Sequence, residues 1–238
     1  MRRIHSFSIG VLATSLACAP PPDLPGAGGG ADLDVAQLDR ESPGGACGHP
    51  SAGDAGYGVG VGQRLANNGE LALVDCEGGD IELADFFCER DDGVFNRGIF
   101  INIGAGWCAP CQEETLELPP LYDEFHPRGI EFVQVLFQDW NAQAPTKQFC
   151  SDWRDGDWVA ADGAEVDADT RLRFPVVMDQ YFEWTAGYLA DPASATPMNI
   201  LVDANGNIRW KLEGQKPDLA VLRSQFELVI GDPYAPPQ

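Results

Sequence analysis

The sequence predicts an α/β domain in which helices cover both faces of a central mixed β-sheet. Short apolar runs that suit buried strands alternate with segments of helical pattern along most of the chain. Hydrophobic residues make up 44% of the 238 residues, which suffices for a packed core and excludes an intrinsically disordered chain. One apolar run leads straight into a Cys-x-x-Cys pair, at the kind of strand-to-helix junction where such sheets carry their sites.

A strong negative charge limits the kinds of partner. The chain has 15 Lys and Arg against 37 Asp and Glu, which gives a formal net charge of -22. Affinity for nucleic acid comes largely from Lys and Arg that neutralise phosphates, so the composition argues against a nucleic-acid partner. An anionic bilayer surface is disfavoured for the same reason, and we expect partners that are basic or neutral.

Residues 1–17 have the pattern of a secretion signal, with Arg2 and Arg3 before a short apolar core. That core is too short to span a bilayer, which needs about 20 apolar residues. Ser15-Leu16-Ala17-Cys18 resembles a bacterial lipobox, so we expect Cys18 to be lipidated. Simple secretion is one alternative, although the mature chain would then begin at Pro20, a residue that generally blocks signal cleavage. An uncleaved anchor is the other.

The rest of the chain divides into a tether and one domain. Residues 18–46 are rich in Pro and Gly and show no apolar periodicity, which predicts a flexible spacer. Residues 47–238 are expected to form a single domain with its core at about residues 69–231. No internal repeat or second linker interrupts that domain.

The first half of the domain is expected to hold a hairpin and then a strand–helix–strand unit. Glu77-Gly78-Gly79 is the turn signal of the hairpin. The two later apolar runs are short enough for buried strands. The expected ranges are 71–76 and 80–83 for the hairpin, 98–103 and 131–137 for the buried strands, and 112–125 for the helix.

The second half adds helices, one more strand and a second hairpin. Asn205-Gly206 marks the turn of that hairpin. An acidic loop at 155–169 lacks the glycine-centred spacing of an EF-hand, so we expect it to be solvated. The expected helices span 145–153, 180–188 and 218–230, and the expected strands span 174–178, 198–202 and 208–212.

The pair Cys108 and Cys111 is the strongest chemical signal. A cysteine at a helix N-terminus has its thiolate stabilised by unpaired N–H groups and the helix dipole. A second cysteine one turn later is close enough to displace a mixed disulfide, and Pro110 stiffens the turn between them. We therefore expect Cys108 to attack and Cys111 to resolve. An inert disulfide and half of a zinc site are the alternatives.

A metal site is not expected. A zinc site built on this pair would need a second Cys or His pair at suitable spacing. After the signal only His49 and His126 remain, and neither occurs in such a pattern. The redox-active disulfide itself would be the working group, with no cofactor.

These residues resemble the thioredoxin-like thiol–disulfide oxidoreductases of the bacterial cell envelope, of the TlpA/ResA type, within the redoxin/AhpC-TSA-like superfamily. The similarity covers about residues 69–231. It rests on Asn102 in the apolar strand, Trp107-Cys108-Ala109-Pro110-Cys111, Glu114, and Ala195-Thr196-Pro197 before a later strand. The resemblance implies a thioredoxin-like fold, here with an N-terminal hairpin extension.

The resemblance also implies roles for residues around the pair. Pro197 stands where the family carries a cis-proline, beside the dithiol, and Thr196 would present its backbone to an extended substrate strand. Trp107 and Pro110 would also contact substrate, and Glu114 would accept a proton from Cys111. In place of the family's aromatic approach to the motif stands Gly104-Ala105-Gly106, which predicts a wider site.

The seven cysteines include four that the dithiol and the lipid anchor do not use: Cys47, Cys76, Cys88 and Cys150. Three pairings are possible. We favour Cys76–Cys88, because these two residues bracket the first hairpin and the turn after it, which leaves Cys47 to pair with Cys150. Each such bridge would contribute about 2–4 kcal/mol by restricting the unfolded chain.

The sequence thus predicts an envelope-anchored enzyme that exchanges disulfides with protein thiols through Cys108, and we expect it to act as a reductant. It would face the periplasm or the exterior, held by a lipid anchor at Cys18, or be secreted if not lipidated. The alternative hypothesis is a redox-inert lipoprotein of the same fold that serves as a binding or scaffold module.

Overall fold

The computed structural model describes residues 49, 57–66, 73–87, 90, 96–161, 163, 166, 170–189 and 195–233. The predicted signal and tether, residues 1–17 and 18–46, lie outside the described residues. So do three of the cysteines, Cys18, Cys47 and Cys88. No helix in the described part is long and apolar enough to cross a membrane.

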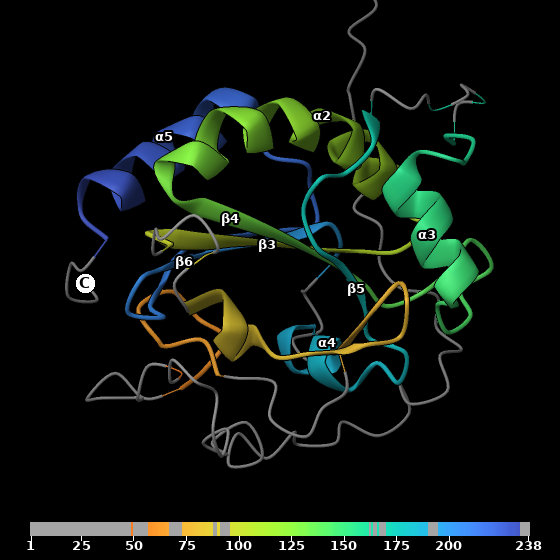
Figure 1. Ribbon diagram of the computed structural model, residues 1–238, viewed down its shortest axis with the longest axis horizontal. Helices are drawn as coiled ribbons and strands as arrows, with labels where there is room; N and C mark the ends of the chain where they lie inside the picture. The colour runs from red at the N-terminus through yellow and green to blue at the C-terminus, as the bar shows by residue number, and fades with distance from the viewer. Residues whose placement is uncertain are drawn as a thin grey trace, which may run out of the picture.

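A mixed β-sheet forms the central layer of the described part (Figure 1). The strands are β1 Leu73–Asp75, β2 Asp80–Ile81, β3 Gly98–Gly104, β4 Ile130–Leu136, β5 Val176–Met178, β6 Met198–Asp203 and β7 Ile208–Glu213. Their order across the sheet is β2-β1-β5-β4-β3-β6-β7. β3, β4 and β5 are parallel neighbours, whereas β6 is antiparallel to β3, β7 to β6, and β1 to both β2 and β5.

Helices cover both faces of this sheet, as the sequence predicts. They are η2 Leu83–Phe87, α2 Ala109–Phe125, η3 His126–Arg128, α3 Lys147–Asp155, α4 Glu183–Tyr188 and α5 Leu219–Gly231, where η marks a 3-10 helix. Figure 1 shows α2 and α5 over one face and α4 under the other. α3 packs into the same core cluster as α2 and α5. The fold is thioredoxin-like, with the β1–β2 hairpin added to the sheet next to β5.

Side chains of the central strands alternate between the two layers. In β3, Ile99 and Ile101 join the cluster that contains Trp184 of α4, while Phe100 joins the cluster that contains Phe226 of α5. β3 and β4 are buried at every position. This explains why both strands read as mainly apolar runs rather than as alternating ones.

Both predicted hairpins are present, and one helix is shorter than predicted. Gly78 and Gly206 adopt φ of 90° and 80° in the two turns, a conformation that favours glycine. α4 begins at Glu183 and not at residue 180, because Phe182 has a left-handed backbone with φ of 57°. The side chain of Asp179 then accepts hydrogen bonds from backbone N–H groups of the first turn of α4.

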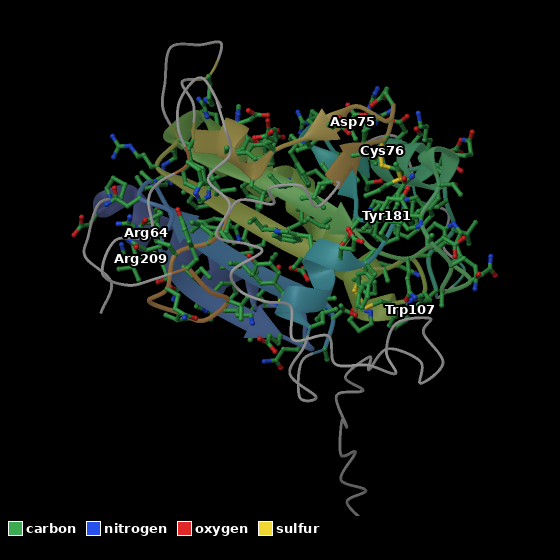
Figure 2. All side chains as sticks on the ribbon, turned by 90° about the horizontal axis from the view of Figure 1, so that it is seen from below. Arg64, Asp75, Cys76, Trp107, Tyr181 and Arg209 are labelled. Atoms are coloured by element: carbon green, nitrogen blue, oxygen red, sulfur yellow. A yellow bond between two sulfur atoms is a disulfide. The ribbon has the colours of Figure 1, made fainter. Side chains whose placement is uncertain are left out.

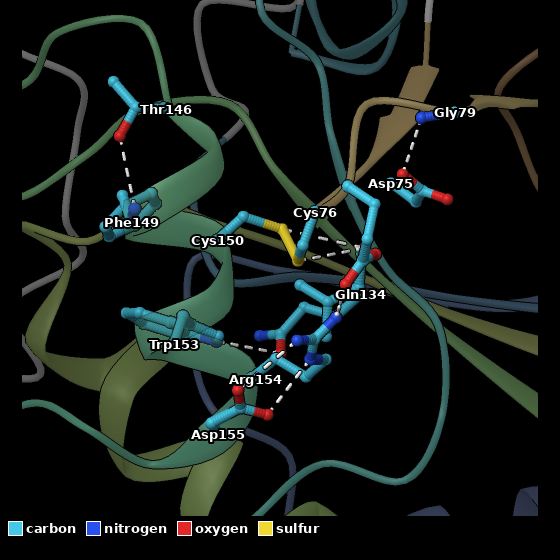
Figure 3. Close-up of a disulfide and its surroundings, with 12 residues drawn as sticks. Asp75, Cys76, Gly79, Gln134, Thr146, Phe149, Cys150, Trp153, Arg154 and Asp155 are labelled. Atoms are coloured by element: carbon cyan, nitrogen blue, oxygen red, sulfur yellow. Dashed lines mark hydrogen bonds and ion pairs between the residues drawn. A yellow bond between two sulfur atoms is a disulfide. The ribbon is translucent and has the colours of Figure 1, made fainter.

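The predicted pairing of the structural cysteines is wrong, since Cys76 forms its disulfide with Cys150 (Figure 3). Cys76 directly follows β1, and β1 pairs with β5. Cys150 lies in α3, which packs beside β5, so both sulfurs lie within 3.8 Å of the carbonyl oxygen of Val176. This bond excludes both Cys76–Cys88 and Cys47–Cys150. Nearness in sequence favours Cys76–Cys88, but the docking of α3 beside β5 brings Cys150 to Cys76 instead.

Loss of the Cys76–Cys150 bond should destabilise the fold. The bond joins residues 74 positions apart, and loop-closure entropy for that length corresponds to about 4 kcal/mol. We expect the double variant Cys76→Ala/Cys150→Ala to lose about that much free energy of unfolding, measured by urea denaturation without reductant. In the double variant Cys108→Ala/Cys111→Ala the lost bond joins residues only three positions apart, so this variant should lose much less free energy of unfolding. Equal losses in the two variants would contradict this account.

Candidate redox site

The pair Cys108 and Cys111 lies where β3 ends and α2 begins. The two cysteines form a disulfide, with their Cα atoms 5.2 Å apart. Cys108 is the N-cap of α2, and Pro110 occupies the first turn, where the missing N–H group is not needed. Since β4 and β5 run parallel to β3, all three strands end at this edge of the sheet. The predicted position of the pair is confirmed.

Two hydrogen-bond donors reach the sulfur of Cys108. The backbone nitrogen of Cys111 lies 3.3 Å away and Oγ1 of Thr196 lies 3.6 Å away. Thr196 precedes β6, and its peptide bond to Pro197 is cis, as the resemblance implies. After reduction both donors would favour the thiolate of Cys108, and so would the N-terminus of α2.

Both cysteines are fully buried, with 0% of their surface exposed. Trp107, directly before the pair, is half-buried and packs edge-on against Phe137. Its indole Nε1 donates a hydrogen bond of 2.8 Å to Oε1 of Gln138. A bulky disulfide can therefore reach the sulfur of Cys108 only if the chain around it moves.

The expectation of a wider site at Gly104-Ala105-Gly106 is wrong. A Cβ atom on Gly106 would lie 2.7 Å from backbone atoms of Asp139 and Trp140. A Cβ atom on Gly104 would lie 3.2 Å from Cβ of Cys111. These glycines allow the loop after β4 and the start of α2 to pack closely against the strand, so their missing side chains leave no open space there.

Glu114 lies one turn after Cys111, on the same side of α2. Its side chain is buried, and Oε2 accepts a hydrogen bond of 3.3 Å from Nδ2 of Asn199. Oε1 is buried without a hydrogen-bond partner among the described residues. Burial raises the pKa of this carboxyl from 4.5 to about 8, against the smaller opposing effect of the neighbouring amide side chains of Asn199 and Asn102.

A row of buried amide side chains crosses the sheet beneath α2. Asn102 of β3 faces Gln134 of β4 on one side and Asn199 of β6 on the other. Asn102 donates to Oδ1 of Asn199 at 2.9 Å and accepts from Nε2 of Gln134 at 2.9 Å. Gln134 also accepts from the indole of Trp153 in α3 and donates to Oγ1 of Thr115 in α2. This amide row therefore links Glu114 to α3 across three strands.

Sequence reasoning missed most of these neighbours. It singled out Asn102 by its place before the cysteine motif, but not Gln134, Asn199 or Gln112. Gln112 is buried and bridges the carbonyl of Gly106 and the backbone nitrogen of Ala161, at 2.6 and 2.7 Å. A signal was present for two of them, because Gln134 and Asn199 interrupt apolar runs that otherwise read as buried strands.

The structure brings some predicted residues together and separates others. The backbone of Cys111 and the side chain of Thr196 both lie next to the sulfur of Cys108, and Glu114 lies one turn after Cys111 on α2. The Cys76–Cys150 bond belongs to a different place, between the β1 end and α3 (Figure 3). Within the described residues, no group of three or more His, Cys, Asp or Glu side chains could hold a metal ion.

Comparison with known proteins gives matches over most of this domain. The family described as Redoxin matches residues 91–226, more than half of the chain. Thiol-disulfide oxidoreductase ResA of Bacillus thuringiensis subsp. konkukian is 24% identical over 156 residues, which covers 66% of this chain and 71% of that protein. ResA of Halalkalibacterium halodurans is 30% identical over 152 residues, which covers 61% and 68%.

Solved structures support the same fold. A protein of Chlorobium tepidum, described as thiol:disulfide interchange protein DsbE, superposes with a TM-score of 0.53 at 19% identity and covers 73% of this chain and 99% of its own. A protein of Sinorhizobium meliloti 1021 gives a TM-score of 0.53 at 17% identity and covers 74% and 86%. At these identities the likeness extends to the fold alone.

The buried carboxyl should make stability depend on pH. In the unfolded chain Glu114 ionises near pH 4.5, whereas in the folded chain it stays protonated up to about pH 8. Between these values the unfolded state binds fewer protons, so this group lowers the free energy of unfolding as pH rises, by at most about 1.4 kcal/mol per pH unit.

Glu114→Gln removes that contribution. The free energy of unfolding of this variant, minus that of the native protein, should increase steadily from about pH 5 to about pH 8 in urea denaturation. Glu113→Gln, at the exposed neighbouring position, is the matched control and should show no such trend. A difference for Glu114→Gln that stays constant with pH would contradict the assigned protonation.

Proposed function

This chain belongs to the redoxin family, and from that premise we propose that it exchanges disulfides with protein thiols of the bacterial cell envelope. It is a thiol–disulfide oxidoreductase. We further propose which residues carry out the exchange, in which direction electrons pass, and in which compartment the protein acts. One observation carries the proposal: Cys108 caps α2, bonds to Cys111, and has its sulfur within reach of two hydrogen-bond donors.

In the proposed reaction the thiolate of Cys108 attacks one sulfur of a client disulfide. The other client sulfur leaves as a thiolate and takes up a proton. Cys111 then loses its proton and attacks the Cys108 sulfur of the mixed disulfide, which releases the second client thiol and restores the Cys108–Cys111 bond. Two electrons pass from the dithiol to the client in each cycle.

Glu114 is the proposed acceptor of the Cys111 proton. Its pKa of about 8 lies close to neutral pH, where a carboxyl can both take up and return a proton. Oε1, which has no hydrogen-bond partner among the described residues, is the oxygen available for this transfer. Support also comes from its position one turn after Cys111 on α2.

The proposed direction is reduction of client disulfides. Burial of Cys108 in apolar surroundings disfavours a charged thiolate and so opposes the hydrogen bonds that favour it. The protein's charge of -22 acts in the same direction as burial. A less stabilised thiolate makes the reduced form the better electron donor.

The envelope location is proposed from the N-terminal sequence and the second disulfide. Residues 1–17 read as a signal, Cys18 as the lipidated residue and residues 18–46 as the spacer that lets the domain stand clear of the membrane. A structural bond such as Cys76–Cys150 is typical of proteins in oxidising compartments. The proposed enzyme needs no cofactor, and Trp107, Pro110, Thr196 and Pro197 are the residues proposed to contact the client.

The two cysteines should fail in different ways. Cys108→Ser should abolish reduction of insulin disulfides, because the attacking thiolate is lost. Cys111→Ser should accumulate a mixed disulfide with the client, because nothing resolves it, and this species is detected by non-reducing electrophoresis and mass spectrometry.

The Cys76→Ser/Cys150→Ser double variant is the control for general loss of thiols. It should keep most of the insulin activity at a temperature where it is folded, because that bond lies outside the redox site. If both single variants retained native activity, the assignment of Cys108 and Cys111 would be refuted.

A further inference from the structure

A small cavity opens at the same edge of the sheet as the redox pair, where β4 and β5 end. Its volume is about 230 Å³. It is formed by the loop after β4 and by the turn between β5 and α4. Its lining includes Phe137, Gln138, Ala142, Ala144, Tyr181 and Phe182.

This cavity is joined to the segment that precedes Cys108. Gln138 accepts the hydrogen bond from the Trp107 indole, and its carbonyl accepts another, at 2.9 Å, from the backbone nitrogen of Gly106. The ring of Phe137 packs against the rings of Trp107 and Phe182, with centroids 6.4 and 5.2 Å apart. Figure 2 shows Trp107 and Tyr181 at one end of the molecule and Arg64 and Arg209 at the other.

The backbone around the cavity is held in an uncommon conformation. In the described part of the chain two non-glycine residues have positive φ, Ala142 and Phe182, both at 57°. Both line this cavity. Such conformations persist only where the surrounding structure imposes them, and they concentrate at ligand sites. Asp139 fixes one of the two loops by accepting hydrogen bonds from the backbone of Asn141 and Gln143.

Size and chemistry limit what the cavity can hold. Its volume is below the roughly 300–1,000 Å³ of small-molecule sites and suits a single amino-acid side chain. No described lining residue is charged, although the whole chain carries -22. Aromatic rings and glutamine amides form the walls, and Tyr181 stands at the rim with 69% of its surface exposed. Exposed aromatic residues of this kind commonly anchor a binding partner.

We propose that this cavity binds an aromatic or large aliphatic side chain of the client polypeptide, near the client cysteine that bonds to Cys108. The occupant follows from continuity with the proposed redox site, from the neutral walls and from the single-residue volume. The cavity would select clients by the residue that flanks their cysteine. This inference rests on the proposed function and adds a determinant of substrate choice to it.

The test uses the reduced full-length chain and nine-residue peptides whose single cysteine carries a thionitrobenzoate group. Phe, Leu, Ser or Asp is placed in turn at each of the three positions on either side of that cysteine. Release of thionitrobenzoate, followed by absorbance, gives the rate of exchange. Bis(2-hydroxyethyl) disulfide, which is neutral and carries no amino-acid side chain, reports exchange at the sulfur alone.

We expect Phe or Leu at one position to react about tenfold faster than Ser, the selectivity that a hydrophobic pocket gives for one apolar group. Ala144→Glu places a charge in the wall, at an exposed position, and should reduce that preference to less than about twofold, as should Tyr181→Ala. The matched control is Ala204→Glu in the β6–β7 turn, at the opposite edge of the sheet, and it should keep the preference. All three variants should react normally with the small disulfide.

The outcomes separate the two claims. If the native protein exchanges with the small disulfide but shows no side-chain preference, or if Ala144→Glu leaves the preference intact, the cavity is not a client site and the proposed function stands. If the native protein exchanges with neither probe, the proposed function fails and this inference fails with it.

Discussion

The sulfur of Cys108 accepts hydrogen bonds from two elements that are far apart in the sequence, the first turn of α2 and Thr196, two residues before β6. Both donors reach it only because α2 starts where β3 ends and β6 runs antiparallel to β3. The arrangement of strands in the mixed sheet therefore determines which groups surround the sulfur of Cys108. It brings a helix N-terminus and the Thr196 hydroxyl to one atom, where they oppose the effect of burial on the thiolate.

The amide row beneath α2 allows the carboxyl of Glu114 to be buried one turn after Cys111. A carboxyl in an apolar layer is unstable unless it is protonated or hydrogen-bonded, and Glu114 is partly both. Asn199, Asn102 and Gln134 satisfy one another across three strands, so direct hydrogen bonds hold the shape of the row. Its contacts with Trp153 and Thr115 then fix α3 and α2 over the same part of the sheet.

Sequence patterns predicted the order of the elements, both hairpins and the place of the redox pair, because apolar runs, Gly turns and a cysteine motif are local signals. They did not predict Cys76–Cys150, since this bond depends on how α3 docks beside β1 and β5. They also mistook Gly106 for a source of open space, because only the folded chain shows the loop after β4 packed against it. Gln134 and Asn199 were visible as polar breaks in apolar strands, but their partners lie on other strands.

We assign turnover to Cys108–Cys111 and a structural role to Cys76–Cys150. The reduction potential of Cys108–Cys111, measured against a glutathione or dithiothreitol buffer, distinguishes a working disulfide from a locked one. We expect a potential less negative than roughly -300 mV, within reach of cellular thiol pools. A potential far more negative than that would mean a locked disulfide, and the chain would then be a redox-inert module of the same fold.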